Sequence, residues 1–139
     1  MTDVDEIDLK LKKYSLDTKD LLKFKKTIEI NSVKVDLICI DYSDKLFISV
    51  STNNSFGSVF FAKSDKISNL EERIYNIRQL FGQAETSLEV FTRSLVQKLN
   101  QKFSIQKSLL VSIGVKKDQI ENLSLLKAIE KNILESFQQ

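Results

Sequence analysis

The feature that most constrains the fold is the apolar pattern between Leu80 and Ile133, which describes a helix, a strand and a second helix in that order. Thr86, followed three residues later by Glu89, predicts a capping box at the start of the first helix. That helix is expected over residues 87–102, because apolar side chains recur there at the spacing of one buried helical face. These side chains are Leu88, Phe91, Leu95, Val96, Leu99 and Phe103.

The strand and the second helix complete this half of the chain. Residues 108–115, SLLVSIGV, are short, apolar and partly β-branched, so they predict a central buried strand. Asp118 is the expected cap of the last helix. The buried face expected for that helix consists of Ile120, Leu123, Leu126, Ile129, Ile133 and Phe137, widened by Leu125 and Leu134.

Residues 24–63 alternate between apolar and polar side chains, as half-buried strands do. Strands are expected near residues 24–30, 33–40, 46–51 and 59–62, separated by Asn, Asp and Ser turns. Because the connections are short, these strands are predicted to form an antiparallel four-stranded meander. Lys63–Glu72 is polar and predicts a loop, and residues 73–80 predict a further strand before Gly82.

The pattern predicts an α+β fold of order β-β-β-β-(β)-α-β-α, in which two amphipathic helices pack on the sheet. Residues 24–139 are expected to form a single domain, and residues 1–23 an N-terminal segment that is free to be flexible. The one cysteine excludes an intramolecular disulfide, and the acidic N-terminus lacks the basic and apolar regions of a signal peptide. We therefore expect a protein of the cytoplasm, or also of the nucleus, with no membrane partner.

The residues that most enzymes depend on are scarce. The chain has no histidine, so it cannot build a Ser-His or Cys-His pair or an imidazole metal site. Cys39 alternates with Val35 and Leu37 on an apolar strand face, which indicates a buried thiol. No phosphate-binding glycine motif or calcium loop is present. We predict no catalytic, cofactor or metal site, although distant carboxylates that meet in the fold would still permit acid–base chemistry.

Partner contacts are the alternative use of such a fold. The turn Asn53–Gly57 and the loop Ser64–Glu72 are expected to be exposed, either as contact sites or as ordinary solvated loops. Phe47 and Phe60 are placed on strand faces away from the core, where they would form a dimer interface if exposed and contiguous. The candidate interface residues are Asn53, Asn54, Ser55, Phe56, Gly57, Ser64, Asp65, Lys66, Phe47 and Phe60.

A basic N-terminal run offers a different hypothesis. Seven lysines lie within residues 10–26, which would suit a small nucleic-acid-binding α/β module. The net charge of +2 is too small to favour that function over a solvated surface, and no basic stripe interleaved with aromatic residues extends the run. Nucleic-acid binding is therefore the second hypothesis.

Several segments together resemble a known family. They are TIEINSVKVDLICIDYSDKLFISVSTNNSFGSVFFA (27–62), IRQLFGQAET (77–86), SLEVFTRSLVQKL (87–99), LLVSIGVKKD (109–118) and LLKAIEKNI (125–133). In order and spacing they resemble proteasome assembly chaperone 3. The LFGQ and LLVSIGV segments are also similar to the sister family, proteasome assembly chaperone 4, whereas residues 26–62 favour the chaperone 3 family. Residues 1–23 form a longer N-terminal segment than the family pattern has.

The resemblance implies a chaperone without catalytic activity. Members of the family pair with a sister chaperone, or with themselves, and bind α-subunits while the α-ring of the 20S proteasome is built. They leave as β-subunits are incorporated. Such a protein needs no cofactor and acts through its surface, which agrees with the absence of histidine and of enzyme motifs from the sequence.

Overall fold

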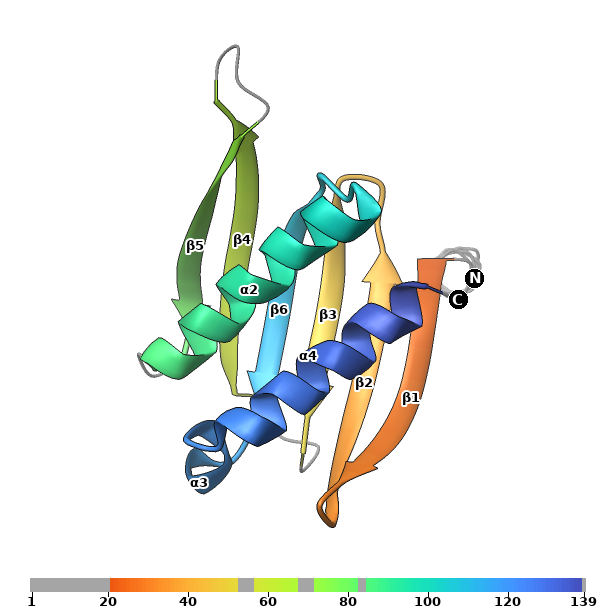
Figure 1. Cartoon of the computed structure of the whole chain (residues 1–139), viewed down its shortest axis with the longest axis vertical. Coiled ribbons are helices and arrows are strands. Elements are labelled where there is room, and N and C mark those ends of the chain that lie inside the picture. Colours follow the sequence, from red (N-terminus) through yellow and green to blue (C-terminus); the bar gives the residue numbers. More distant parts are fainter. Residues whose placement is uncertain (1–20, 53–56, 68–71, 83–84, 139) are drawn as a thin grey trace, which may run out of the picture.

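A computed structural model describes residues 21–52, 57–67, 72–82 and 85–138. It is a sheet with helices packed against one face (Figure 1). The strands are β1 (Leu22–Ile30), β2 (Val33–Asp41), β3 (Lys45–Ser51), β4 (Ser58–Lys66), β5 (Arg73–Phe81) and β6 (Ser108–Gly114). The helices are α2 (Thr86–Phe103), α3 (Lys117–Ile120) and α4 (Leu123–Phe137). The predicted α+β class, with its central late strand, is confirmed.

The order of the strands corrects the predicted meander. The sheet runs β1-β2-β3-β6-β4-β5, so β6 lies between β3 and β4 and pairs in parallel with β3 and antiparallel with β4. Residues 52–57 can span about 20 Å when extended, and two strand spacings are only about 10 Å. The short connection therefore leaves room for an inserted strand. The apolar β6 takes this central place, where its buried side chains need cover from both neighbours.

The core lies between the sheet and the helices α2 and α4. The helix-facing side chains of the central strands are buried, those of the edge strands β1 and β5 are partly buried, and the predicted stripes of both helices meet them. Burial of one such Leu, Ile or Phe contributes roughly 1.5–3 kcal/mol, which holds the helices on the sheet. The central contributors are Leu37, Ile48, Phe60, Leu95, Leu99, Val111, Ile129 and Ile133.

Both predicted helix caps are wrong. Helix α2 begins at Thr86, so the N-cap residue is Glu85, which forms no side-chain capping bond. Asp118 lies inside the short helix α3, and the side chain of Asn122 caps α4 by accepting the Leu125 N–H at 3.2 Å. The start of α2 is shifted by one residue from the prediction and the start of α4 by about one turn, and each shift places a different residue at the N-cap.

One strand boundary and the exposure of one side chain also differ from the expectation. Strand β4 continues to Lys66 and pairs with β5 up to Arg73, so the predicted loop begins several residues too early. The β4–β5 hairpin extends beyond the helices there, so its outer residues have little core to face and are polar (Figure 1). Leu123, expected in the buried stripe, is the first residue of α4 and is 62% exposed.

Gly57 packs directly against the backbone of β6. A Cβ at this position would overlap the carbonyl oxygen of Ile113 and come within 3.0 Å of the Gly114 Cα. Neither atom can move without shifting the central strand, so Gly57→Ala is expected to lower the free energy of unfolding by about 1–3 kcal/mol. Urea denaturation measures this loss, with the exposed Ser43→Ala as a control. An unchanged midpoint for Gly57→Ala would contradict the close packing.

Candidate partner-binding surface

The sheet has one face covered by helices and one that these helices leave open. Both long helices, α2 and α4, lie across the same side of the sheet (Figure 1). The strand residues that point to the opposite side alternate with the buried core residues, and most of them are half-buried or exposed, with Ser112 of β6 as a buried exception. We call this opposite side the open face, and six of its apolar residues are Ile38, Ile40, Phe47, Val59, Phe61 and Leu110.

Strand register gathers the apolar residues of the open face into rows. Ile40 pairs with Phe47, Phe47 with Leu110, and Leu110 with Phe61, so four apolar side chains lie in line across β2, β3, β6 and β4. Side chains that are directly opposite on neighbouring strands touch one another, so the row is a continuous apolar surface. We call these four residues the apolar row.

A second row beside the first is partly polar. Ile38 pairs with Ser49, Ser49 with Ser112, and Ser112 with Val59. Val59 pairs with Phe81 of the edge strand β5, whose side chain is 63% exposed. The second row therefore places Ser49 and the buried Ser112 between apolar residues, so the open face is less apolar here than along the apolar row.

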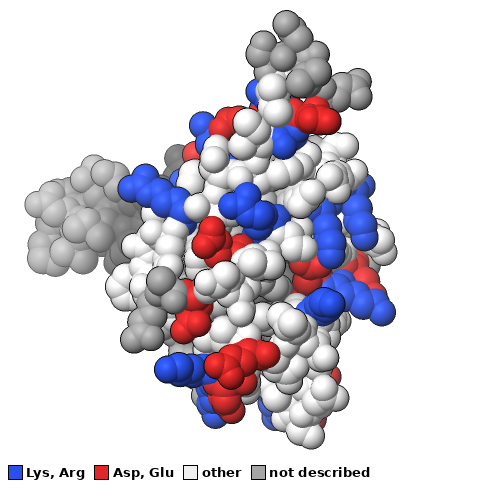
Figure 2. All heavy atoms as spheres, turned by 60° about the vertical axis from the view of Figure 1, so that its left-hand side comes forward, with Lys and Arg blue, Asp and Glu red and all other residues white. Residues whose placement is uncertain are grey.

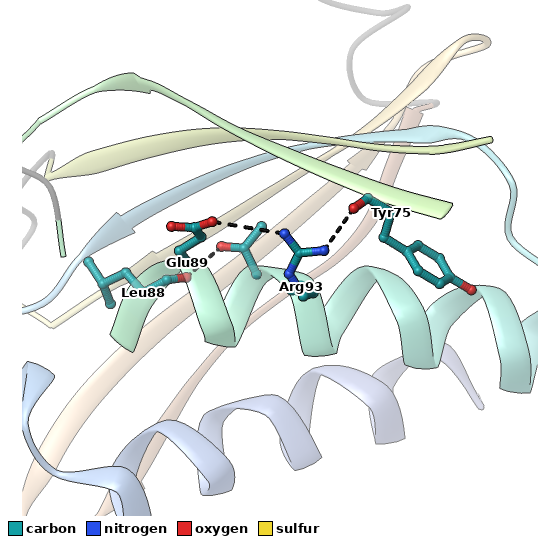
Figure 3. Close-up of polar contacts among 5 residues, drawn as sticks. Tyr75, Leu88, Glu89 and Arg93 are labelled. Carbon is teal, nitrogen blue, oxygen red and sulfur yellow. Dashed lines mark hydrogen bonds and ion pairs between the residues drawn. The ribbon is translucent and has the colours of Figure 1, made fainter. Parts of the chain in front are cut away.

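Helix α2 fixes the edge strand β5, which borders the open face. The Arg93 guanidinium donates a hydrogen bond to the Tyr75 carbonyl oxygen at 2.8 Å and lies 3.9 Å from the Glu89 carboxylate (Figure 3). The Tyr75 hydroxyl donates to the Asn100 side-chain oxygen at 2.9 Å. These contacts hold the strand against the helix, so the outer part of the open face is a preformed surface.

The structure separates the two phenylalanines that were expected to lie together. Phe47 lies on the open face, as predicted, in the middle of the apolar row. The prediction that Phe60 faces away from the core is wrong, because this residue is 1% exposed and points into the core beneath the helices. Its neighbours Val59 and Phe61 take the open-face positions that were expected for Phe60.

The predicted turn and loop residues fall in different environments. Asn53, Asn54, Ser55 and Phe56 lie outside the described residues, and Gly57 packs on β6. Ser64, expected in an exposed loop, is a buried residue of β4 on the helix-facing side. Asp65 and Lys66 are exposed, but they belong to the end of β4.

Three open-face residues were missed from the sequence, namely Val59, Phe61 and Leu110. In β4 both phases of the alternation carry apolar residues, so periodicity alone does not show which phase faces the core. Leu110 belongs to a strand that reads as buried on both sides. Pairing the strand with β3 is what shows that Leu110 continues a row that begins at Ile40.

The described residues offer little for catalysis. Among them, no group of three or more Cys, Asp or Glu side chains could hold a metal ion. Cys39 is fully buried in the core, as its apolar strand face predicts, and burial raises the pKa of its thiol to about 12. Within the described part of the chain, no helix is both long enough and apolar enough to span a membrane.

The thiol of Cys39 is expected to be unreactive in the folded protein. At pH 8 a thiol with this pKa is only ~0.01% ionised, and the thiolate is the nucleophile. A disulfide reagent should therefore label Cys39 only after denaturant is added. The folded thiol stays protonated above pH ~8.5, where an unfolded cysteine ionises, so the free energy of unfolding falls from there toward pH 12. Rapid stoichiometric labelling of the native protein would contradict this burial.

The lysines at the end of the basic run do not share a face. Lys25 is exposed on the open face, whereas Lys26 points to the helices and donates to the Asn132 carbonyl oxygen at 3.3 Å. Lys23 lies over the Phe137 ring at 5.2 Å from its centroid. Figure 2 shows basic and acidic side chains interspersed on the side of the molecule that it displays. The described lysines of the basic run, Lys23, Lys25 and Lys26, therefore form no stripe of the kind that follows a phosphate backbone.

Comparison with known proteins identifies relatives of one kind. The family model of proteasome assembly chaperone 3 matches residues 48–133, which is more than half of the chain. Mouse proteasome assembly chaperone 3 is 24% identical over 105 residues, covering 75% of this chain and 85% of the mouse protein. A crystal structure of a chaperone complex for yeast 20S proteasome assembly contains a chain with the same fold. Its TM-score is 0.63 at 15% identity, covering 82% of this chain and 96% of that one.

Proposed function

Because the chain belongs to the proteasome assembly chaperone 3 family, we propose that it is a non-catalytic chaperone for assembly of the 20S proteasome α-ring. In this role it pairs with a sister chaperone, or with a second copy of itself, and binds α-subunits until β-subunits are incorporated. Family membership supports the assembly role. The apolar row on the open face is the observation that carries the pairing.

The open face suits contact with another sheet. The apolar row crosses three strand spacings, which is about 14 Å, and ends at the exposed Arg78 of β5, which pairs with Phe61. Two sheets packed face to face lie about 10 Å apart and interdigitate side chains such as those of the row. A partner sheet on the open face would bury the row in the way that the helices bury the other side.

The polar components of the open face are consistent with a chaperone that is later released. Ser49 interrupts the second row with a half-buried hydroxyl group, and Asp36, Lys34 and Thr27 lie beyond Ile38 toward β1 and the start of β2. Interfaces of moderate size with an apolar centre and a polar rim are typical of separable complexes. A wholly apolar face would favour a permanent one.

The assembly role is tested by depleting the chain in its native cells. We expect fewer assembled 20S particles and an accumulation of unassembled α-subunits, because ring construction would lose its chaperone. Native gels with subunit-specific antibodies measure both quantities, and re-expression of the unmodified chain should restore them. Normal 20S levels and no free α-subunits after complete depletion would refute the assembly role.

A further inference from the structure

A groove of about 670 Å³ runs between α2 and α4, on the side of the molecule opposite the open face. The two helices lie side by side and run in the same direction across the sheet (Figure 1). Side chains from both helices line the groove along its length, so it is a surface feature of the helical layer.

The end of the groove near the helix starts is apolar and exposed. Val90 on α2 is 59% exposed and Leu123 on α4 is 62% exposed, although both could have been polar without loss to the core. Phe91 and Leu126 lie between them as the buried floor. Large apolar residues that flank a concave surface from two elements are typical of a contact site.

The other half of the groove is basic. Lys102 on α2 and Lys127 and Lys131 on α4 are exposed, and none of them forms an ion pair with a described residue. Lys98, which also lines the groove, is instead paired with Glu130 across the two helices. Beyond this pair, Glu135 is the one carboxylate among the lining residues. The groove therefore has surplus positive charge, which extends from Lys127, one turn after Leu123, to Lys131 and Lys102 farther along.

The spacing of these groups defines a complementary ligand. Along α4, Leu123 and Lys131 are eight residues apart, which is about 12 Å of helix axis. Along α2, Val90 and Lys102 are twelve residues apart, or about 18 Å. A ligand that places an apolar anchor at one end and carboxylates from about 6 to 18 Å away, roughly one to three helical turns, would satisfy both ends.

We propose that this groove binds an acidic amphipathic segment of a partner protein. The apolar anchor of the segment packs between Val90 and Leu123, and its carboxylates pair with Lys102, Lys127 and Lys131. Because the groove and the open face lie on opposite sides of the molecule, both can be occupied at once. The inference does not depend on the identity of the protein that covers the open face.

The test uses the full chain and a fluorescent helical peptide with leucines in its first turn and glutamates in its last turns. We expect saturable binding by fluorescence anisotropy, weakened by added salt, and no binding of a peptide with lysines in place of the glutamates. The double reversal Lys127→Glu with Lys131→Glu should weaken binding by about tenfold or more. Leu123→Asp should also weaken it, and thermal unfolding verifies that each variant is folded.

The matched control is Lys25→Glu with Lys34→Glu, which changes the net charge equally but on the open face. This control should bind the acidic peptide within about twofold of the unmodified chain. Equal effects of the two reversals, equal binding of acidic and basic peptides, or no binding would overturn the proposal.

Two other occupants are outcomes of the same assay. The sequence carries its own acidic cluster at Asp3, Asp5, Glu6 and Asp8. If neutralising these four residues in the full chain tightens peptide binding several-fold, that cluster is the occupant and the partner proposal fails. Self-association that is abolished by the Lys127 and Lys131 reversals would instead assign the groove to a second copy, and would equally overturn the proposal.

Discussion

Replacing Phe60 with alanine is expected to lower the free energy of unfolding by about 3–5 kcal/mol. Phe60 is 1% exposed and lies in the core between β4 and the helices. Removing its ring deletes a large buried apolar surface and leaves a cavity that the close-packed surroundings fill only in part. Chemical denaturation followed by circular dichroism measures the loss.

Phe61→Ala is the matched control, since it makes the same chemical change one residue later on the open face. Phe61 is only half-buried, so its loss should cost less than half as much stability as that of Phe60. Equal losses for the two variants, or a larger loss for Phe61, would show that the assignment of the β4 faces is wrong.

Introducing a charge into the apolar row is expected to disrupt pairing with the partner. Phe47 lies between Ile40 and Leu110, so a partner packed on the row would have to bury the carboxylate of Phe47→Asp without a counter-charge. We expect pairing to weaken by at least about 30-fold, the effect of losing a central anchor of an interface. Sedimentation of the purified chain, alone and mixed with a chaperone of the sister family, measures the proposed complex.

The control for this variant is Ser124→Asp, which places the same charge at an exposed position of α4, on the helical side of the molecule and outside the lining of the groove. It should leave pairing through the open face unchanged. Comparable loss of pairing in both variants would indicate a partner on the helices rather than on the sheet. Intact pairing of Phe47→Asp would show that the open face is not the pairing surface.

Periodicity was sufficient to locate most strands and both long helices. The spacing from Leu88 to Leu99 predicts α2, and the apolar run over residues 108–115 predicts β6, because each pattern reflects burial along one local element. The family resemblance, which depended on the order of these segments, is confirmed by the match over residues 48–133.

The neighbours of each strand could not be predicted in the same way. The short link after Ser51 favoured a hairpin of β3 with β4, but pairing depends on competition with β6, which is far away in the sequence. No local sequence pattern indicates that β6 lies between β3 and β4, where it is flanked by a strand on each side. The apolar row could not be predicted for the same reason, because it forms only when β6 lies between β3 and β4.

The candidate surface was accordingly predicted only in part. Phe47 was assigned to the correct face because β3 is apolar in one phase and mixed in the other. Phe60 was assigned to the wrong face because Val59, Phe60, Phe61 and Ala62 are all apolar, and only packing under α2 decides between the phases. The helix caps were predicted wrongly because Thr86, Asp118 and Asn122 are all residue types that cap helices, whereas the N-cap position of α2 is occupied by Glu85, which is not one of them.

The measurement that tests the central claim most directly is affinity capture of the tagged chain from its native cells, quantified by mass spectrometry. The account predicts that the unmodified bait retains proteasome α-subunits together with a sister chaperone or an untagged copy of itself. It also predicts that Phe47→Asp loses the paired chaperone while remaining folded. A folded, unmodified bait that captures neither α-subunits nor a paired chaperone would contradict the assembly function.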